Sequence, residues 1–135
     1  MHHGSCLCGG VHYELNAEIS LVIYCHCSQC RRATGSAFNT TTLAPTKALR
    51  FTSGEELLAV FESIPGKRRH FCKQCGSPIF TSVSTDPENI RLRLGTVADP
   101  PSHVPGFHIF VASKAPWYEI RDDLKQFPDS LRASP

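Results

Sequence analysis

Seven cysteines are the residues of this 135-residue chain whose type and spacing point most directly to chemistry. They fall into three clusters, which read Cys6-Leu-Cys8, Cys25-His-Cys27-Ser-Gln-Cys30 and Cys72-Lys-Gln-Cys75. An odd number of cysteines does not suit a framework of disulfides, whereas clustered thiolates bind zinc tightly. The spacing therefore predicts that the cysteines ligate zinc.

The first and third clusters together predict a closed site with four thiolates. If Cys6 and Cys8 lie on a strand, residues i and i+2 face the same side and can ligate one ion. A tight turn from Cys72 to Cys75 would bring two further sulfurs together, and Gly76 permits the positive φ that often follows such a turn. Four thiolates around one ion are typical of a structural zinc site, which here would cross-link two distant segments.

The middle cluster offers the three sulfurs of Cys25, Cys27 and Cys30, without an obvious fourth ligand. His26 lies between two ligands that would share one face of a strand, so we expect its ring to point away from the metal. A zinc ion with three protein ligands keeps a position for water or substrate, as catalytic zinc sites do. The cluster therefore predicts a catalytic zinc.

Two other arrangements of the ligands are consistent with the spacing. A histidine (His26, His70 or His108) can close the middle site and make it a second structural one. Alternatively, Cys27 and Cys30 can join Cys72 and Cys75 in a site like that of a zinc ribbon, but this pairing leaves the other three cysteines without a metal.

The elements that must position these ligands read as short strands separated by Gly, Pro and Asp-rich breakers, which is typical of an all-β fold. A helical turn over residues 31–34 is expected to end at Gly35. The polar segment from Asp122 to Pro135 is expected to form a helix or to fray. The predicted strands cover residues 11–15, 21–24, 37–43, 57–61, 68–71, 78–84, 90–97 and 108–111.

Composition and charge exclude several classes of function. The 14 basic and 12 acidic residues give a net charge of +2, and Lys67-Arg68-Arg69 is the single basic run, so we expect no nucleic-acid partner. No apolar run approaches the roughly 20 residues that span a bilayer, so we expect no membrane partner. The N-terminal residues lack the apolar region of a signal peptide, which predicts a cytoplasmic location.

Four stretches of the chain form a specific pattern: residues 4–13, 25–38 and 71–77 contain the cysteine clusters, and residues 108–117 begin at His108. In order and spacing they resemble the family of glutathione-dependent formaldehyde-activating enzymes and centromere protein V. The resemblance implies a single domain over residues 1–135, with a matched core of about residues 4–118 and a C-terminal tail over 119–135. It also implies a β-tent fold and two zinc ions, a structural one on Cys6, Cys8, Cys72 and Cys75 and a catalytic one on Cys25, Cys27 and Cys30. The stretches are Gly4-Ser-Cys-Leu-Cys-Gly-Gly-Val-His-Tyr13, Cys25-His-Cys-Ser-Gln-Cys-Arg-Arg-Ala-Thr-Gly-Ser-Ala-Phe38, Phe71-Cys-Lys-Gln-Cys-Gly-Ser77 and His108-Ile-Phe-Val-Ala-Ser-Lys-Ala-Pro-Trp117.

The resemblance implies a carbon–sulfur lyase or synthase that acts on adducts of a small thiol and an aldehyde, such as S-hydroxymethylglutathione. His26 or His108 would move protons at that site. Arg31, Arg32 and Lys114 are candidates for binding the carboxylates of glutathione, because guanidinium and ammonium groups pair with carboxylates. A zinc-stabilised binding or scaffold module without catalysis is the alternative. The sequence leaves the oligomeric state and the true substrate open.

Overall fold

The fold is built mainly from short strands, with one α-helix and four 3-10 turns among the residues that the structure describes. The structure, a computed structural model, describes residues 1–130. The elements are β1 (His2–Ser5), β2 (His12–Leu15), β3 (Val22–Cys25), α1 (Ser28–Thr34), β4 (Asn39–Pro45), η1 (Thr46–Ala48), β5 (Leu49–Ser53), η2 (Glu55–Leu57), β6 (Leu58–Ile64), β7 (Lys67–Cys72), β8 (Pro78–Val83), β9 (Asp86–Arg93), η3 (Leu94–Thr96), β10 (Gly106–Ile109), η4 (Val111–Ser113) and β11 (Lys125–Gln126).

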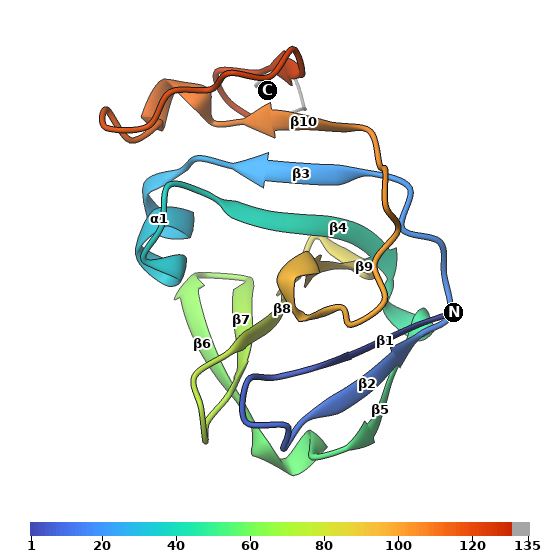
Figure 1. The fold of residues 1–135 in the computed structure, drawn as a ribbon. Helices are drawn as coiled ribbons and strands as arrows, with labels where there is room; N and C mark the ends of the chain where they lie inside the picture. Colours follow the sequence, from blue (N-terminus) through green and yellow to red (C-terminus); the bar gives the residue numbers. More distant parts are fainter. Residues whose placement is uncertain (131–135) are drawn as a thin grey trace.

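The strands form two sheets that lie against each other (Figure 1). The small sheet has the order β1-β2-β5, and the large one has the order β11-β10-β3-β4-β9-β8-β7-β6. All pairs are antiparallel except β10 with β3 and β10 with β11. The all-β prediction is confirmed. Within residues 1–130, no helix is long and apolar enough to span a membrane.

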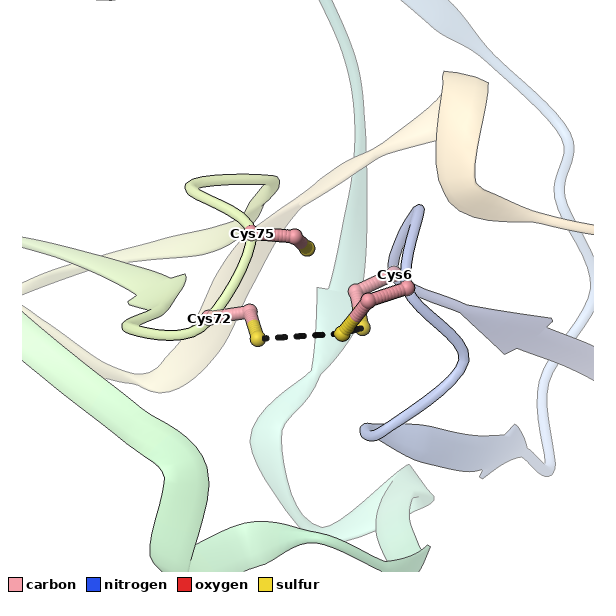
Figure 2. Close-up of side chains that lie close together, drawn as sticks. Cys6, Cys72 and Cys75 are labelled. Atoms are coloured by element: carbon pink, nitrogen blue, oxygen red, sulfur yellow. Dashed lines mark hydrogen bonds between the residues drawn. The ribbon is translucent and has the colours of Figure 1, made fainter.

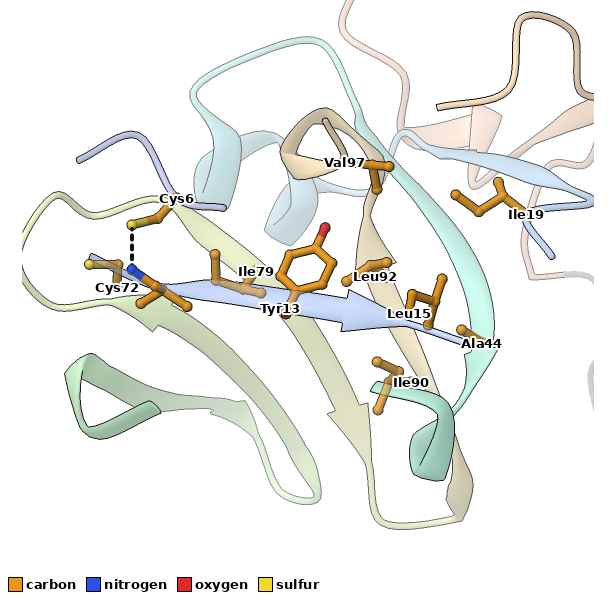
Figure 3. Packing of buried hydrophobic residues seen from close by; sticks show 11 residues of the cluster. Cys6, Tyr13, Leu15, Ile19, Ala44, Cys72, Ile79, Ile90, Leu92 and Val97 are labelled. Carbon is orange, nitrogen blue, oxygen red and sulfur yellow. Dashed lines mark hydrogen bonds between the residues drawn. The ribbon is translucent and has the colours of Figure 1, made fainter. Parts of the chain in front are cut away.

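The hydrophobic core lies between the two sheets (Figure 3). Tyr13 and Leu15 alternate along β2 with outward-facing polar residues, and they pack against Ile79, Ile90 and Leu92 of the large sheet. All five side chains are almost fully buried. Burying one such side chain stabilises a fold by about 1.5–3 kcal/mol, so this layer holds the sheets together.

The predicted elements agree with the structure where a local signal defines them. The helical turn is confirmed as α1, and Gly35 ends it in the left-handed region with φ 65°. Eight predicted strands overlap observed ones, but the strand expected over residues 90–97 stops at Arg93 and gives way to η3. The predictions missed β1 and β5, which flank β2 in the small sheet and carry little apolar periodicity.

The C-terminal segment corrects the expectation of a helix or a frayed end. Its described part adds β11 to the large sheet, parallel to β10. Further backbone hydrogen bonds join Phe110 to Asp129 and Phe127 to His108. These contacts hold residues 125–129 alongside β10 and the residues that follow it (Figure 1), because a strand edge offers unpaired N–H and C=O groups. Residues 131–135 of the expected tail lie outside the described residues.

Candidate metal centres and the adjoining cavity

The sulfurs of Cys6, Cys8, Cys72 and Cys75 all lie within 4.8 Å of one another. The Sγ atoms of Cys6 and Cys8 are 3.5 Å apart, and those of Cys8 and Cys72 are 3.9 Å apart. A tetrahedron with zinc–sulfur bonds of about 2.3 Å has edges of about 3.8 Å, so the spacing fits four thiolates on one ion. Figure 2 shows Cys6, Cys72 and Cys75 converging from two separate turns.

Both pairs of cysteines in this four-cysteine cluster lie in turns. Cys6 and Cys8 follow β1, where the Gly9 N–H donates to the Cys6 carbonyl, so the strand geometry expected for them is wrong. A turn brings the two sulfurs to one side as well as a strand would. In the second turn the Gly76 N–H donates to the Cys72 carbonyl, and Gly76 has φ 82°. The positive φ predicted for Gly76 is confirmed.

Hydrogen bonds around the four-cysteine cluster stabilise the negative charge on sulfur. The Val11 N–H donates to Cys6 Sγ at 3.3 Å. Ser77 Oγ lies 3.2 Å from Cys75 Sγ and accepts a hydrogen bond from the Leu7 N–H, so Ser77 links the two turns. The hydrogen bond with the Ser77 side chain, helped by backbone N–H groups, lowers the pKa of Cys75 to about 5. These contacts favour thiolates, the form that binds metal, at Cys6 and Cys75.

The second group comprises Cys25, Cys27 and Cys30, whose sulfurs also lie within 4.8 Å of one another. Cys25 ends β3, Cys27 is the N-cap of α1 and Cys30 lies in its first turn, so the shared strand face expected for Cys25 and Cys27 is wrong. The cap of α1 brings Cys27 and Cys30 together, because the Cys30 N–H donates to Cys27 Sγ at 3.3 Å. Within residues 1–130, no histidine or carboxylate joins this three-cysteine cluster.

The three-cysteine cluster favours a thiolate at Cys30. Hydrogen bonds from Cys25 and Cys27 lower the pKa of Cys30, and they outweigh the opposite effect of burial. The Asn39 side chain donates to Cys30 Sγ at 3.4 Å, and the charge of Lys67 acts in the same direction. The same thiol hydrogen bonds, together with burial, raise the pKa of Cys25.

A cavity of about 530 Å³ adjoins the three-cysteine cluster, and Cys25 and Cys30 line its wall. Its size lies in the range of small-molecule sites. The cavity lies on the face of the large sheet opposite the core, because its lining residues alternate with core residues along β4 and β9. Phe110, which has φ 56°, also lines the cavity; this backbone conformation is rare for a residue other than glycine.

His26 and His108 are buried and form a hydrogen-bonded chain with Asp122, which is exposed. His26 Nε2 lies 2.8 Å from His108 Nδ1, and His108 Nε2 lies 3.0 Å from an Asp122 oxygen. Because a carboxylate only accepts, we assign a proton to His108 Nε2; His108 Nδ1 then accepts from His26 Nε2–H. His26 Nδ1 is left as a buried acceptor without a hydrogen-bond partner among residues 1–130.

The surroundings of His26 keep its ring neutral. Burial, followed by the electrostatic influence of His108 and Lys114, lowers the pKa of His26 to about 4. His108 stacks on Tyr24, with ring centroids 4.9 Å apart. The pair therefore lies within an aromatic layer beside the turn that carries Cys25 and Cys27.

The cations expected to bind substrate lie away from the cavity. Arg31, Arg32 and Lys114 are not among the residues that line it. Arg32 is exposed on α1. Lys114 Nζ donates to the backbone carbonyls of Ala115 and Tyr118. A role of these three residues in substrate binding stays a prediction.

Sequence reasoning missed the polar side chains that surround the three-cysteine cluster. Asn39 bonds to Cys30, Asp122 bonds to His108, and Lys67 and Arg69 line the cavity. The alternation along β7 is the signal that could have separated Lys67 and Arg69 from Arg68, because alternate residues of a strand face opposite sides.

The fold and the two cysteine clusters define a small all-β protein with two candidate metal sites, one of which adjoins a cavity. The sequence profile of the glutathione-dependent formaldehyde-activating enzyme (GFA) family matches residues 1–113. The chain belongs to this family.

The individual relatives share less than 30% of their aligned residues with this chain. Proteins of Emericella nidulans and Penicillium rubens, both named "Putative glutathione-dependent formaldehyde-activating enzyme", are 27% and 28% identical over 81 residues, which is 60% of this chain. The matched regions span only 41% and 42% of those relatives. A crystal structure of a Rhodobacter sphaeroides protein shares the fold, with a TM-score of 0.63 and 24% identity over 77% of this chain and 98% of that one.

Proposed function

We propose that this protein is a zinc-dependent enzyme that makes or breaks the carbon–sulfur bond in adducts of a small thiol and an aldehyde, such as S-hydroxymethylglutathione. The observation that carries the proposal is the three-cysteine cluster on the cavity wall, which has no fourth protein ligand within residues 1–130. Membership of the GFA family supports glutathione and formaldehyde as the substrates.

In this proposal the four-cysteine cluster holds a structural zinc ion, and Cys25, Cys27 and Cys30 hold a catalytic one. Bound zinc would favour the thiolate form of a substrate thiol and act as a Lewis acid. Asn39 orients Cys30 through its side-chain N–H, and the cap of α1 orients Cys27. Such outer contacts typically change metal affinity by about 10- to 100-fold.

The proposed reaction requires the chain to bring a thiol and an aldehyde together in the cavity. In the synthetic direction the thiol sulfur forms a bond to the carbonyl carbon, and the carbonyl π pair moves to oxygen. That oxygen then takes up the proton that the thiol has lost, so the adduct is a hydroxymethyl thioether. The reverse reaction releases the aldehyde and restores the thiol. Holding both reactants in one cavity reduces the entropic part of the barrier.

His26 and His108 stay predictions as groups that move the proton. A pKa of about 4 makes the His26 ring a weak acceptor near neutral pH. Their hydrogen bond of 2.8 Å supports a positioning role, in which the pair fixes the turn between Cys25 and Cys27. We propose this positioning role as their main contribution.

Exchange of formaldehyde with glutathione, followed by NMR, tests the proposal. The zinc-loaded protein should accelerate exchange above the uncatalysed rate, and Cys27→Ser should lose most of that acceleration, at least about 10- to 100-fold. Zinc analysis should find two ions per chain in the wild type and one in the variant. Folded, fully loaded protein that leaves the exchange rate unchanged would contradict the proposed activity and favour a scaffold role.

A further inference from the structure

We propose that Lys67 and Arg69 form a carboxylate-binding subsite in the cavity that holds the three-cysteine cluster, and that this subsite recognises a carboxylate of the thiol substrate. The inference rests on the proposed function for the identity of its ligand. It assigns substrate binding to β7 in place of Arg31, Arg32 and Lys114.

The register of the large sheet places the subsite and the three-cysteine cluster on one face. Arg69 pairs with Thr81, and Thr81 pairs with Arg91. Two residues further along β9, Arg93 pairs with Thr41, and Asn39, two residues before Thr41, pairs with Cys25. Directly paired residues share a face, and so do residues two apart on a strand. A continuous polar row therefore leads from β7 to Cys25, and Lys67 lies two residues before Arg69 on the same face.

The guanidinium group of Arg69 carries hydrogen-bond donors that have no partner among residues 1–130. Its side chain lines the cavity, and the residue is only 9% exposed. Both terminal nitrogens, Nη1 and Nη2, are buried without a hydrogen-bond partner among residues 1–130. The hydroxyl of its strand partner Thr81, which also lines the cavity, is buried and unpartnered too. A buried guanidinium without partners is costly, and its two parallel N–H groups match the two oxygens of a carboxylate.

The charges around the cavity leave Lys67 and Arg69 without a paired carboxylate from residues 1–130. Asp86 also lines the cavity, but its carboxylate pairs with Arg91 at 3.2 Å. None of the ion pairs within residues 1–130 involves Lys67 or Arg69. The positive charge of these two residues is therefore available for an anionic ligand.

The chemistry of the subsite identifies the class of ligand. Glutathione carries two carboxylates and its thiol on one flexible molecule, so a carboxylate on β7 and the sulfur at the three-cysteine cluster can be held at the same time. The apolar side chains of Ile23, Leu43 and Val83 line the rest of the cavity and suit the uncharged part of such a ligand. A thiol without a carboxylate would contact the three-cysteine cluster but not the subsite of Lys67 and Arg69.

Binding of S-methylglutathione tests the inference, because this probe keeps both carboxylates and has no free thiol. We would measure its dissociation constant by NMR titration of the zinc-loaded protein, for the wild type, Arg69→Gln and Lys67→Gln. Each substitution should weaken binding by roughly 10- to 100-fold, as expected for the loss of hydrogen bonds to a charged group. Arg68→Gln is the matched control, because Arg68 is exposed and lies on the opposite face of β7, and it should change binding by less than about 2-fold.

The diethyl ester of S-methylglutathione supplies the second half of the test. Esterification removes the negative charge, so the wild type should bind the diester more weakly than the acid by a similar factor. Arg69→Gln should then show a clearly smaller difference between the two probes than the wild type, because only Lys67 is left to distinguish the acid from the ester. Equal binding of the acid by the wild type, Arg69→Gln and Lys67→Gln would overturn the inference, and so would a wild type that does not bind the acid.

Two controls separate this inference from other roles of the same residues. If Arg69 only balanced thiolate charge, Arg69→Gln would lower the zinc affinity of the three-cysteine cluster and leave probe binding unchanged, which overturns the subsite. If Arg69→Gln does not fold, Arg69→Lys keeps the charge but loses the fork, and binding should fall between the wild type and Lys67→Gln. A protein that binds the probe through Arg69 but does not accelerate formaldehyde exchange would contradict the proposed function and leave the subsite standing.

Discussion

At the scale of single residues, Cys27 and Cys75 offer a matched comparison. Both are partly exposed thiols at a turn, and each belongs to a cluster that can hold a metal. Cys75 belongs to a group that joins residues distant in the sequence, whereas the partners of Cys27 lie within three residues of it. Loss of metal should therefore affect the fold at one position and only the local site at the other.

We expect Cys75→Ser to lower the thermal midpoint by at least about 10 °C, because removing one of four ligands of a structural metal costs several kcal/mol. Cys27→Ser should lower it by less than about 4 °C, since serine is a good N-cap and the sheet does not depend on this cluster. Calorimetry of both variants under the same zinc concentration checks this. Equal losses of stability would show that the two clusters do not differ in role.

At the scale of elements, the C-terminal segment is held to the large sheet by β11 and by the Asp122–His108 contact. Desolvation raises the pKa of Asp122, but the hydrogen bonds from His108 and the Leu124 N–H, with smaller electrostatic contributions from His108 and His26, outweigh it, so the pKa lies below its ordinary value. A carboxylate with a lowered pKa in the folded state stabilises that state when it is ionised.

Asp122→Asn should therefore reduce the free energy of unfolding above the ordinary pKa of an aspartate, and the difference should vanish as the pH falls through the lowered pKa. The effect should stay below about 1 kcal/mol, because Asp122 is 42% exposed and solvent screens the pair. Urea unfolding between pH 7 and pH 3 measures it. Asp123→Asn is the control, since Asp123 is an exposed neighbour that leaves both cysteine clusters intact; a difference that grows at low pH would contradict the sign.

At the scale of the whole molecule, the proposed function assigns stability to the core and the four-cysteine cluster, and chemistry to the three-cysteine cluster. The core lies between the sheets, and the four-cysteine cluster joins the β1–β2 turn of the small sheet to the β7–β8 turn of the large one. The cavity and the three-cysteine cluster lie on the opposite face of the large sheet. On the proposed assignment, metal at the three-cysteine cluster can therefore dissociate without opening the core.

Removal of metal by a chelator should accordingly occur in two steps. The first zinc ion, from the three-cysteine cluster, should leave without a change in far-UV circular dichroism. The second should leave only with loss of the folded state, because binding energy at a closed structural site is also folding energy. Zinc release monitored beside circular dichroism during the titration measures both steps, and simultaneous release of both ions on unfolding would contradict this division.

The sequence by itself determined those features that depend on short spacings. Clusters of cysteines within a few residues of one another can meet in few ways, so their grouping into four and three followed from spacing and family resemblance together, and the structure brings the sulfurs of each group together. Gly35 and Gly76 likewise indicated the end of a helix and a tight turn, because a backbone position with positive φ favours glycine in any fold. The all-β class followed from short strands between frequent breakers.

Only the tertiary structure decided which distant residues share a site. The cavity is lined both by Cys25 on β3 and by Arg69 on β7, which are separated in the sheet by strands whose order cannot be read from local periodicity. From the sequence alone, Arg31 and Arg32 are therefore the natural candidates for binding substrate, because they follow Cys30 directly. The same holds for Asp122, which contacts His108 from the start of a segment expected to be a helix or a frayed end. Pairing between distant strands depends on long-range packing, which local sequence patterns do not reveal. In the folded sheet, Lys67 and Arg69 of the basic run face the cavity, whereas Arg68 faces solvent.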